Sequence, residues 1–123
     1  MPSIANQSLR EYALSRPGAW PDSPWSDGHD VAKVGPGERG KIFVFLGEDT
    51  IGVKCGRTRE EADEWLVRYP QDATVMAYIG RSGWNTLNTD GAIPLGELIE
   101  AIEDSYDLVV SRMPKKDRPV QEG

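Results

Sequence analysis

The sequence contains a single cysteine, Cys55, and a single histidine, His29. One cysteine cannot form a disulfide within the chain, and such scarcity is typical of proteins from a reducing compartment. A structural zinc site needs about four nitrogen or sulfur ligands, which this pair cannot supply. We therefore expect a cytoplasmic protein without a bound metal.

Long apolar runs are also missing. No segment approaches the roughly 20 apolar residues that a membrane-spanning helix needs. The first residues, MPSIANQSLR, lack the apolar run of a signal peptide. We expect a soluble monomer that does not associate with membranes.

Positive charge is in deficit, with 14 Lys and Arg against 20 Asp and Glu, for a net charge of −6. Nucleic-acid binders usually show an overall or local cationic excess, because neutralising phosphates supplies most of their affinity. The whole-chain balance therefore argues against a strong non-specific DNA binder. It allows a local cationic patch, since the field at a site is local at physiological salt.

The 123 residues suffice for one domain with its own core, predicted over residues 1–118, with 119–123 as a frayed tail. Helical patterns cover residues 8–18, 58–70 and 94–113. Ser8 with Glu11, and Thr58 with Glu61, have the spacing of capping boxes. The last helix starts at Pro94 and carries a continuous apolar stripe.

Strand patterns cover residues 31–35, 41–46, 50–55, 74–79 and 84–88. The segment KIFVFL (41–46) is apolar on both faces, which predicts a central strand. Residues 18–30, GAWPDSPWSDGHD, are predicted as a loop. The order α-β-β-β-α-β-β-α predicts a two-layer α+β domain, in which the first and last helices pack across an antiparallel sheet.

Signals of an enzyme are weak. Cys55 falls on the apolar side of its strand, which favours a buried structural thiol over a nucleophile paired with His29. The carboxylates of 60–64 lie on a charged helix face, where solvation is the default. The glycines do not follow the strand-then-helix spacing of a phosphate loop. We expect no catalytic residues and no cofactor.

The stretch GRSGWN (80–85) lies between two predicted strands and allows two interpretations. In one, Arg81 and the backbone N–H groups of Gly80, Ser82 and Gly83 meet a phosphate, as the tip of a wing would. In the other, the glycines supply positive φ for a turn and Trp84 packs into the core. Three further cations, Lys54, Arg57 and Arg59, lie close together in the sequence, but their position relative to Arg81 is open.

The tryptophans raise a second possibility. Trp20 and Trp25 share the loop 18–30, and Trp84 follows the glycine stretch. Together they could form a surface that binds a protein or a small ligand, although such residues more often anchor a loop to the core.

The chain resembles the MmcQ/YjbR family of small bacterial proteins over about residues 7–118. The resemblance rests on the order and spacing of short motifs: RPGAWPDSPW, HDVAKVG, KIFVFL, IGVKC, RYP, GWNTLNTDGAIP and DSYDLVVSRMPKK. It implies a frataxin-like (CyaY-like) α+β fold. Members of the family are generally described as DNA-binding, through a helix and wing arrangement.

This chain departs from the family at the glycine stretch. Many members read approximately His-Leu-Asn-Lys-x-His-Trp where this chain has residues 78–84. The basic residue is retained as Arg81 and the tryptophan as Trp84, whereas the histidines and the asparagine are absent. Iron-binding members of the frataxin-like fold rely on a crowded acidic first helix. Here that helix offers Glu11 between Arg10 and Arg16, so we expect no iron site.

The leading hypothesis is a non-enzymatic protein that binds double-stranded DNA through phosphate contacts. Its candidate residues are Arg81 with Gly80, Ser82 and Gly83, then Lys54, Arg57 and Arg59, and more weakly Lys115 and Lys116. No helix carries residues at the spacing that reads bases. The alternative is the tryptophan surface of Trp20, Trp25 and Trp84, with no nucleic acid.

Overall fold

A computed structural model describes residues 4–24 and 30–119. Its helices and strands are α1 (Ile4–Leu14), β1 (Ala19–Asp22), β2 (Asp30–Val34), β3 (Lys41–Leu46), β4 (Thr50–Lys54), α2 (Arg59–Arg68), β5 (Ala73–Val75), β6 (Trp84–Asn88) and α3 (Leu95–Ser111). Three short 3₁₀ helices are η1 (Gly37–Arg39), η2 (Gly80–Ser82) and η3 (Lys115–Asp117). No helix within the described residues is long and apolar enough to cross a membrane.

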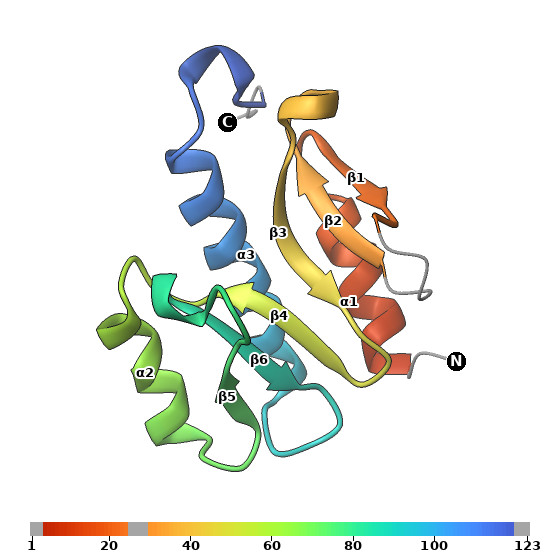
Figure 1. The fold of residues 1–123 in the computed structure, drawn as a ribbon. Helices are drawn as coiled ribbons and strands as arrows, with labels where there is room; N and C mark the ends of the chain where they lie inside the picture. Colours follow the sequence, from red (N-terminus) through yellow and green to blue (C-terminus); the bar gives the residue numbers. More distant parts are fainter. Residues whose placement is uncertain (1–3, 25–29, 120–123) are drawn as a thin grey trace.

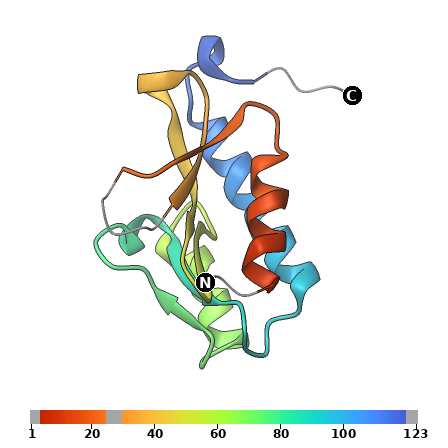
Figure 2. The ribbon, with the colours of Figure 1, turned by 90° about the vertical axis from the view of Figure 1, so that its right-hand side faces the viewer.

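The strands form one antiparallel sheet in the order β1-β2-β3-β4-β6-β5 (Figure 1). Both α1 and α3 lie on one face of it, and the segment that leads from β5 to β6 lies on the other (Figure 2). We call these the helix face and the open face. The predicted two-layer α+β class is confirmed.

The core lies between the sheet and the helices α1 and α3. Leu9 and Ala13 of α1 are fully buried, and so are Val44, Ile51 and Leu87 of the sheet. The predicted apolar stripe of α3 and the turn after it contributes its buried members: Leu98, Ile102, Tyr106, Val109, Val110 and Met113. Leu95, the first residue of α3, is by contrast 46% exposed.

The predicted loop 18–30 contains a strand. Residues Ala19–Asp22 form β1, which pairs with β2 in the register Trp20↔Lys33. Pro21 interrupts the strand signal, but a proline is tolerated here because β1 is at the edge of the sheet. The indole Nε1 of Trp20 donates to the Gly35 carbonyl at 2.9 Å and holds the strand in place.

Two other boundaries differ from prediction. Helix α1 begins at Ile4, so Ser8 lies within the helix and is not its N-cap. The buried Asn6 anchors the first turn, because its Nδ2 donates to the carbonyls of Gly47 and Thr50 at 2.9 and 3.1 Å. Strand β5 ends at Val75 instead of residue 79, and shortly beyond it Tyr78 has a left-handed φ of 65°.

The predicted second capping box is confirmed in its first half, and its return bond goes to Arg57 instead of the N-cap residue. Thr58 is the N-cap of α2, and its side chain accepts from the backbone N–H of Glu61. The Glu61 carboxylate in turn accepts from the N–H of Arg57 at 2.8 Å. Pro94 was predicted as the first residue of the last helix. It is instead the N-cap of α3, the position before the first helical residue.

Strands β3 and β4 diverge where β4 ends (Figure 1). Only three residue pairs join them, from Leu46↔Ile51 to Val44↔Val53. Beyond these, the register between β2 and β3 slips at Phe43, as a β-bulge does. The hydroxyl of Ser105 in α3 donates to the Phe43 carbonyl at 2.6 Å and accepts from the Lys54 N–H at 2.9 Å. We call the opening between β3 and β4, beyond their three residue pairs, the fork.

Candidate functional site

The glycine stretch forms a tight turn between β5 and β6. Residues Gly80–Ser82 make the single turn η2, and Gly83 follows in the left-handed region with φ 97°. A Cβ on Gly83 would lie 2.3 Å from the Gly56 carbonyl oxygen, so the turn admits no side chain at this position. Gly80 does not need positive φ; it is buried against Val75.

Two of the backbone N–H groups proposed to meet a phosphate are already engaged. The N–H of Ser82 donates to the Ile79 carbonyl at 3.1 Å, and that of Gly83 to the Gly80 carbonyl at 3.0 Å. These two donors serve the turn itself. A phosphate at this turn would therefore depend chiefly on the side chain of Arg81.

Lys54 lies beneath the turn. It is the last residue of β4 and is only 4% exposed. Its ammonium Nζ donates to the Ser82 carbonyl at 2.5 Å. Burial, and secondarily the nearby Arg112 guanidinium, lowers the pKa of Lys54 because both disfavour its charged form.

Arg59 holds the other side of the turn. Its guanidinium donates to the carbonyls of Gly80 and Trp84 at 2.7 and 3.1 Å. It also bonds to the amide oxygen of the buried Asn85 and pairs with Asp63 at 2.7 Å. These contacts occupy the guanidinium, so Arg59 supports the turn and is not free to meet a ligand.

Arg57 and Arg81 are both exposed, and neither has an ion-pair partner within the described residues. They belong to adjoining segments, because Gly83 packs directly against the backbone of Gly56. The structure therefore brings Arg57, Arg59 and Lys54 to the turn that carries Arg81, which the sequence had left open.

Lys115 and Lys116 lie in η3, just beyond α3, and are exposed. This turn is held against η1 by Arg39, which pairs with Asp117 at 3.0 Å. The pairing lowers the pKa of Asp117. The end of α3 also approaches η2, since Arg112 and Met113 line the same hollow as Ser82.

That hollow opens at the fork, and we call it the fork pocket. It has a volume of about 310 Å³ and is lined by Lys41, Ile42, Lys54, Ser82, Trp84, Val109, Arg112 and Met113. Of these, sequence reasoning named only Lys54, Ser82 and Trp84 as candidate site residues. The others could not be predicted, because they meet only where β3 and β4 separate over α3.

The tryptophans do not form one exposed surface among the described residues. Trp84 is 9% exposed, and its ring packs edge-on to Phe45 with centroids 5.6 Å apart. Trp20 is half-buried on β1, and three strands separate β1 from β6. Trp25 lies outside the described residues.

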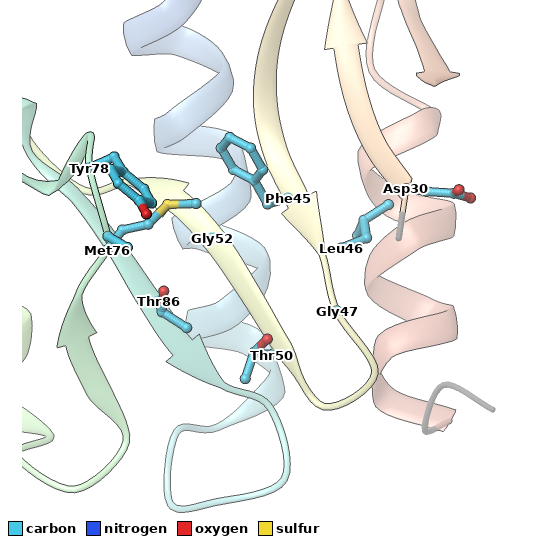
Figure 3. A pocket seen from close by; sticks show the side chains of 10 residues that line it. Asp30, Phe45, Leu46, Gly47, Thr50, Gly52, Met76, Tyr78 and Thr86 are labelled. Atoms are coloured by element: carbon cyan, nitrogen blue, oxygen red, sulfur yellow. The ribbon is translucent and has the colours of Figure 1, made fainter. Parts of the chain in front are cut away.

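A second hollow lies on the open face of the sheet, with a volume of about 480 Å³ (Figure 3). Phe45, Gly52 and Met76 form its apolar part, and the fully exposed Tyr78 stands at its rim. Its one carboxylate, Asp30, already pairs with Arg10 at 2.7 Å. The hollow therefore offers apolar contact but no free charged group.

No group of three or more His, Cys, Asp or Glu within the described ranges is arranged to hold a metal ion. Burial raises the pKa of the Cys55 thiol to about 12, so the thiolate needed for nucleophilic chemistry does not form near neutrality. His29 lies outside the described residues.

The comparisons with known proteins agree with this fold. The family model YjbR matches residues 14–108. The crystal structure of protein DR2400 of Deinococcus radiodurans, which contains a DUF419 domain, superposes with a TM-score of 0.80 at 22% sequence identity. The similarity covers 90% of this chain and 83% of that one. No curated protein matches the chain significantly.

Proposed function

Because the chain belongs to the YjbR family, we propose that it is a non-enzymatic, cytoplasmic protein that binds duplex DNA through phosphate contacts at the 80–83 turn. The observation that carries the proposal is the pair Arg57 and Arg81. Both are exposed cations without an ion-pair partner in the described part of the chain, on segments that pack against each other.

The turn supports this role because it is held rigidly from beneath. Lys54 and Arg59 together bind the carbonyls of Gly80, Ser82 and Trp84. A fixed turn loses little conformational freedom when its arginine meets a phosphate, and arginine is well suited to phosphate geometry. Lys115 and Lys116 on η3 would add electrostatic attraction.

Such contacts position a protein on DNA without reading its sequence. No base-reading element is part of the proposal. The net charge of −6 sets a further expectation. Binding should be weak and strongly salt-dependent, because the acidic remainder of the molecule repels the duplex.

The test is fluorescence anisotropy of a labelled duplex, titrated at low and then at physiological salt. We expect saturable binding at low salt that weakens as salt rises. Arg81→Ala and Arg57→Ala should each reduce affinity severalfold and lower the magnitude of the salt slope by about 1.

Lys33→Ala is the matched control, since it removes the same charge but lies on β2, where Lys33 pairs with Asp22 at 2.7 Å. It should bind DNA almost as the wild type does. Absence of binding at low salt would refute the proposal. So would equal losses in Lys33→Ala and Arg81→Ala, because binding would then depend only on total charge.

A further inference from the structure

The fork pocket has a feature that the proposed DNA contacts do not use. It combines one buried ammonium, from Lys54, with two exposed cations, Lys41 and Arg112. The lining contains no carboxylate. Asp117 senses the charge of Lys41, but Arg39 already binds both oxygens of Asp117 at 3.1 Å.

Lys54 is the unusual member of this group. Its side chain is buried, yet no carboxylate in the described residues pairs with it. An ammonium group carries three N–H donors, and the Ser82 carbonyl accepts one. A buried charge without a counter-ion is costly, so an anion that entered the pocket would relieve that cost.

The backbone keeps this ammonium in place. The N–H of Lys54 donates to the hydroxyl of Ser105, which fixes the end of β4 over α3. The Ser82 carbonyl fixes the other end of the side chain. The ammonium therefore stays at the pocket and does not extend into water.

The remaining lining is apolar. Ile42, Trp84, Val109 and Met113 come from β3, β6 and α3 and its end. The volume of about 310 Å³ falls at the small end of ligand pockets, which are mostly apolar with a few placed polar groups. A bare inorganic anion would leave these four side chains without a contact.

We propose that the fork pocket binds a small organic oxyanion, in which a carboxylate or phosphate group is joined to an apolar body. The anionic group accepts hydrogen bonds from Lys54 and Arg112. The body packs against Trp84 and Met113. Lys54 and Ser82 adjoin both sites, but Arg57 and Arg81 do not line the pocket. Variants of these two arginines therefore let the two proposals fail independently.

The experiment is a two-dimensional amide and methyl NMR titration with two probes, benzoate and phenyl phosphate, at constant ionic strength. Inorganic phosphate and benzyl alcohol are the comparison compounds, since each carries half of the required chemistry. We expect saturable shifts at Lys54, the Trp84 indole and the Met113 methyl with at least one probe. Both comparison compounds should bind about tenfold more weakly or worse.

Lys54→Met keeps most of the length of the side chain, one atom short of lysine, and removes its charge. It should weaken probe binding by about tenfold or more, since hydrogen bonds to charged groups are the stronger ones. Arg112→Gln changes an exposed residue and should also weaken probe binding. It replaces Lys54→Met as the test if that variant fails to fold. Arg57→Gln, outside the pocket, should leave binding unchanged, and so should Arg81→Ala.

Three outcomes would overturn the proposal. They are the absence of saturable shifts with both probes, undiminished binding in Lys54→Met and Arg112→Gln, and inorganic phosphate binding as tightly as phenyl phosphate. Loss of DNA binding in Arg81→Ala with probe binding intact would support both proposals at once.

Discussion

At the scale of single residues, the glycine at position 83 has the strictest requirement. It has a left-handed φ of 97°, and a Cβ added to it would lie 2.3 Å from the Gly56 carbonyl oxygen. One of the two interpretations of this stretch held that its glycines supply positive φ, and Gly83 agrees with it. Gly80 is required for a different reason, which is its close packing against Val75.

Gly83→Ala should lower the free energy of unfolding by about 2–3 kcal/mol, from backbone strain together with the clash against Gly56. Urea denaturation measures this change. Gly96→Ala is the control, because Gly96 lies in α3 and the added methyl would meet nothing within 4 Å beyond its chain neighbours and the backbone of its own helix. It should stabilise by up to about 1 kcal/mol. Equal effects at both positions would contradict this account.

Cys55 gives a residue-scale prediction on pH. Its pKa is raised from 9.0 to about 12, mainly by burial, so the folded state holds the thiol proton more tightly than the unfolded state does. The protonated thiol therefore contributes to the free energy of unfolding. This contribution is fully present below pH 9 and is lost as pH rises toward 12.

The measurement compares the unfolding free energies of the wild type and Cys55→Ala across that alkaline range. As pH rises, the unfolding free energy of the wild type should fall relative to that of Cys55→Ala. The thiol should also resist alkylation at about pH 8 in the folded protein and react once urea unfolds it. Rapid alkylation of the folded protein would show that the thiol is accessible.

At the scale of elements, Ser105 joins α3 to two strands at once. Its hydroxyl satisfies the Phe43 carbonyl and the Lys54 N–H, both backbone groups at the fork. In regular pairing, those groups would bond to the neighbouring strand.

Ser105→Ala should therefore destabilise the protein by about 1–3 kcal/mol, because it leaves two buried polar groups unsatisfied. The amide of Lys54 should exchange its hydrogen faster, which NMR can follow. Ser111→Ala on the same helix is the control, since the Ser111 hydroxyl bonds only to the Leu108 carbonyl on the exposed side. A neutral effect of Ser105→Ala would mean that water replaces the hydroxyl without cost.

Sequence patterns predicted elements best where a periodic face is long. The segments 41–46 and 84–88 match β3 and β6 residue for residue, and α3 follows its apolar stripe. The errors arose where tertiary contacts override local signals. Asn6 extends α1 toward a hairpin some 40 residues away in sequence, and pairing with β2 makes a strand of a segment that contains Pro21.

The candidate site was predictable only in part for a similar reason. Proximity in sequence correctly grouped Lys54, Arg57 and Arg59, and the structure adds that they surround the turn of Arg81. Proximity in sequence could not indicate that the side chains of Lys54 and Arg59 donate to backbone carbonyls. Nor could proximity in sequence place Lys41 and Arg112 together, because they line one pocket only where β3 and β4 separate over α3.

At the scale of the whole molecule, acidic side chains link distant parts of the chain. Asp117 ties η3 to η1, and Glu97 ties α3 to Arg68 and Tyr69 of α2 and its end. Hydrogen bonds from these partners lower the pKa of both carboxyl groups. Burial acts the other way on Asp104 and Asp107, whose pKa values are raised.

A carboxyl group with a lowered pKa stabilises the fold above its ordinary pKa, and this contribution is lost as pH falls through the lowered value. Asp117→Asn should therefore lose less stability than the wild type between about pH 6 and about pH 3. Urea denaturation at the two pH values measures the difference. Parallel losses in both proteins would show that Asp117 does not contribute to acid unfolding.

The position of α3 in the sequence has a consequence for the order of folding. This helix covers both sides of the fork, yet it follows every other long element of the described residues. The sheet formed by β1, β2 and β3 leaves the ribosome with only α1 to shield its apolar face. Contacts between α1 and α3 must then form late. Completion of α3 is the step that closes the core, and a chain released before it would expose the surface that drives aggregation.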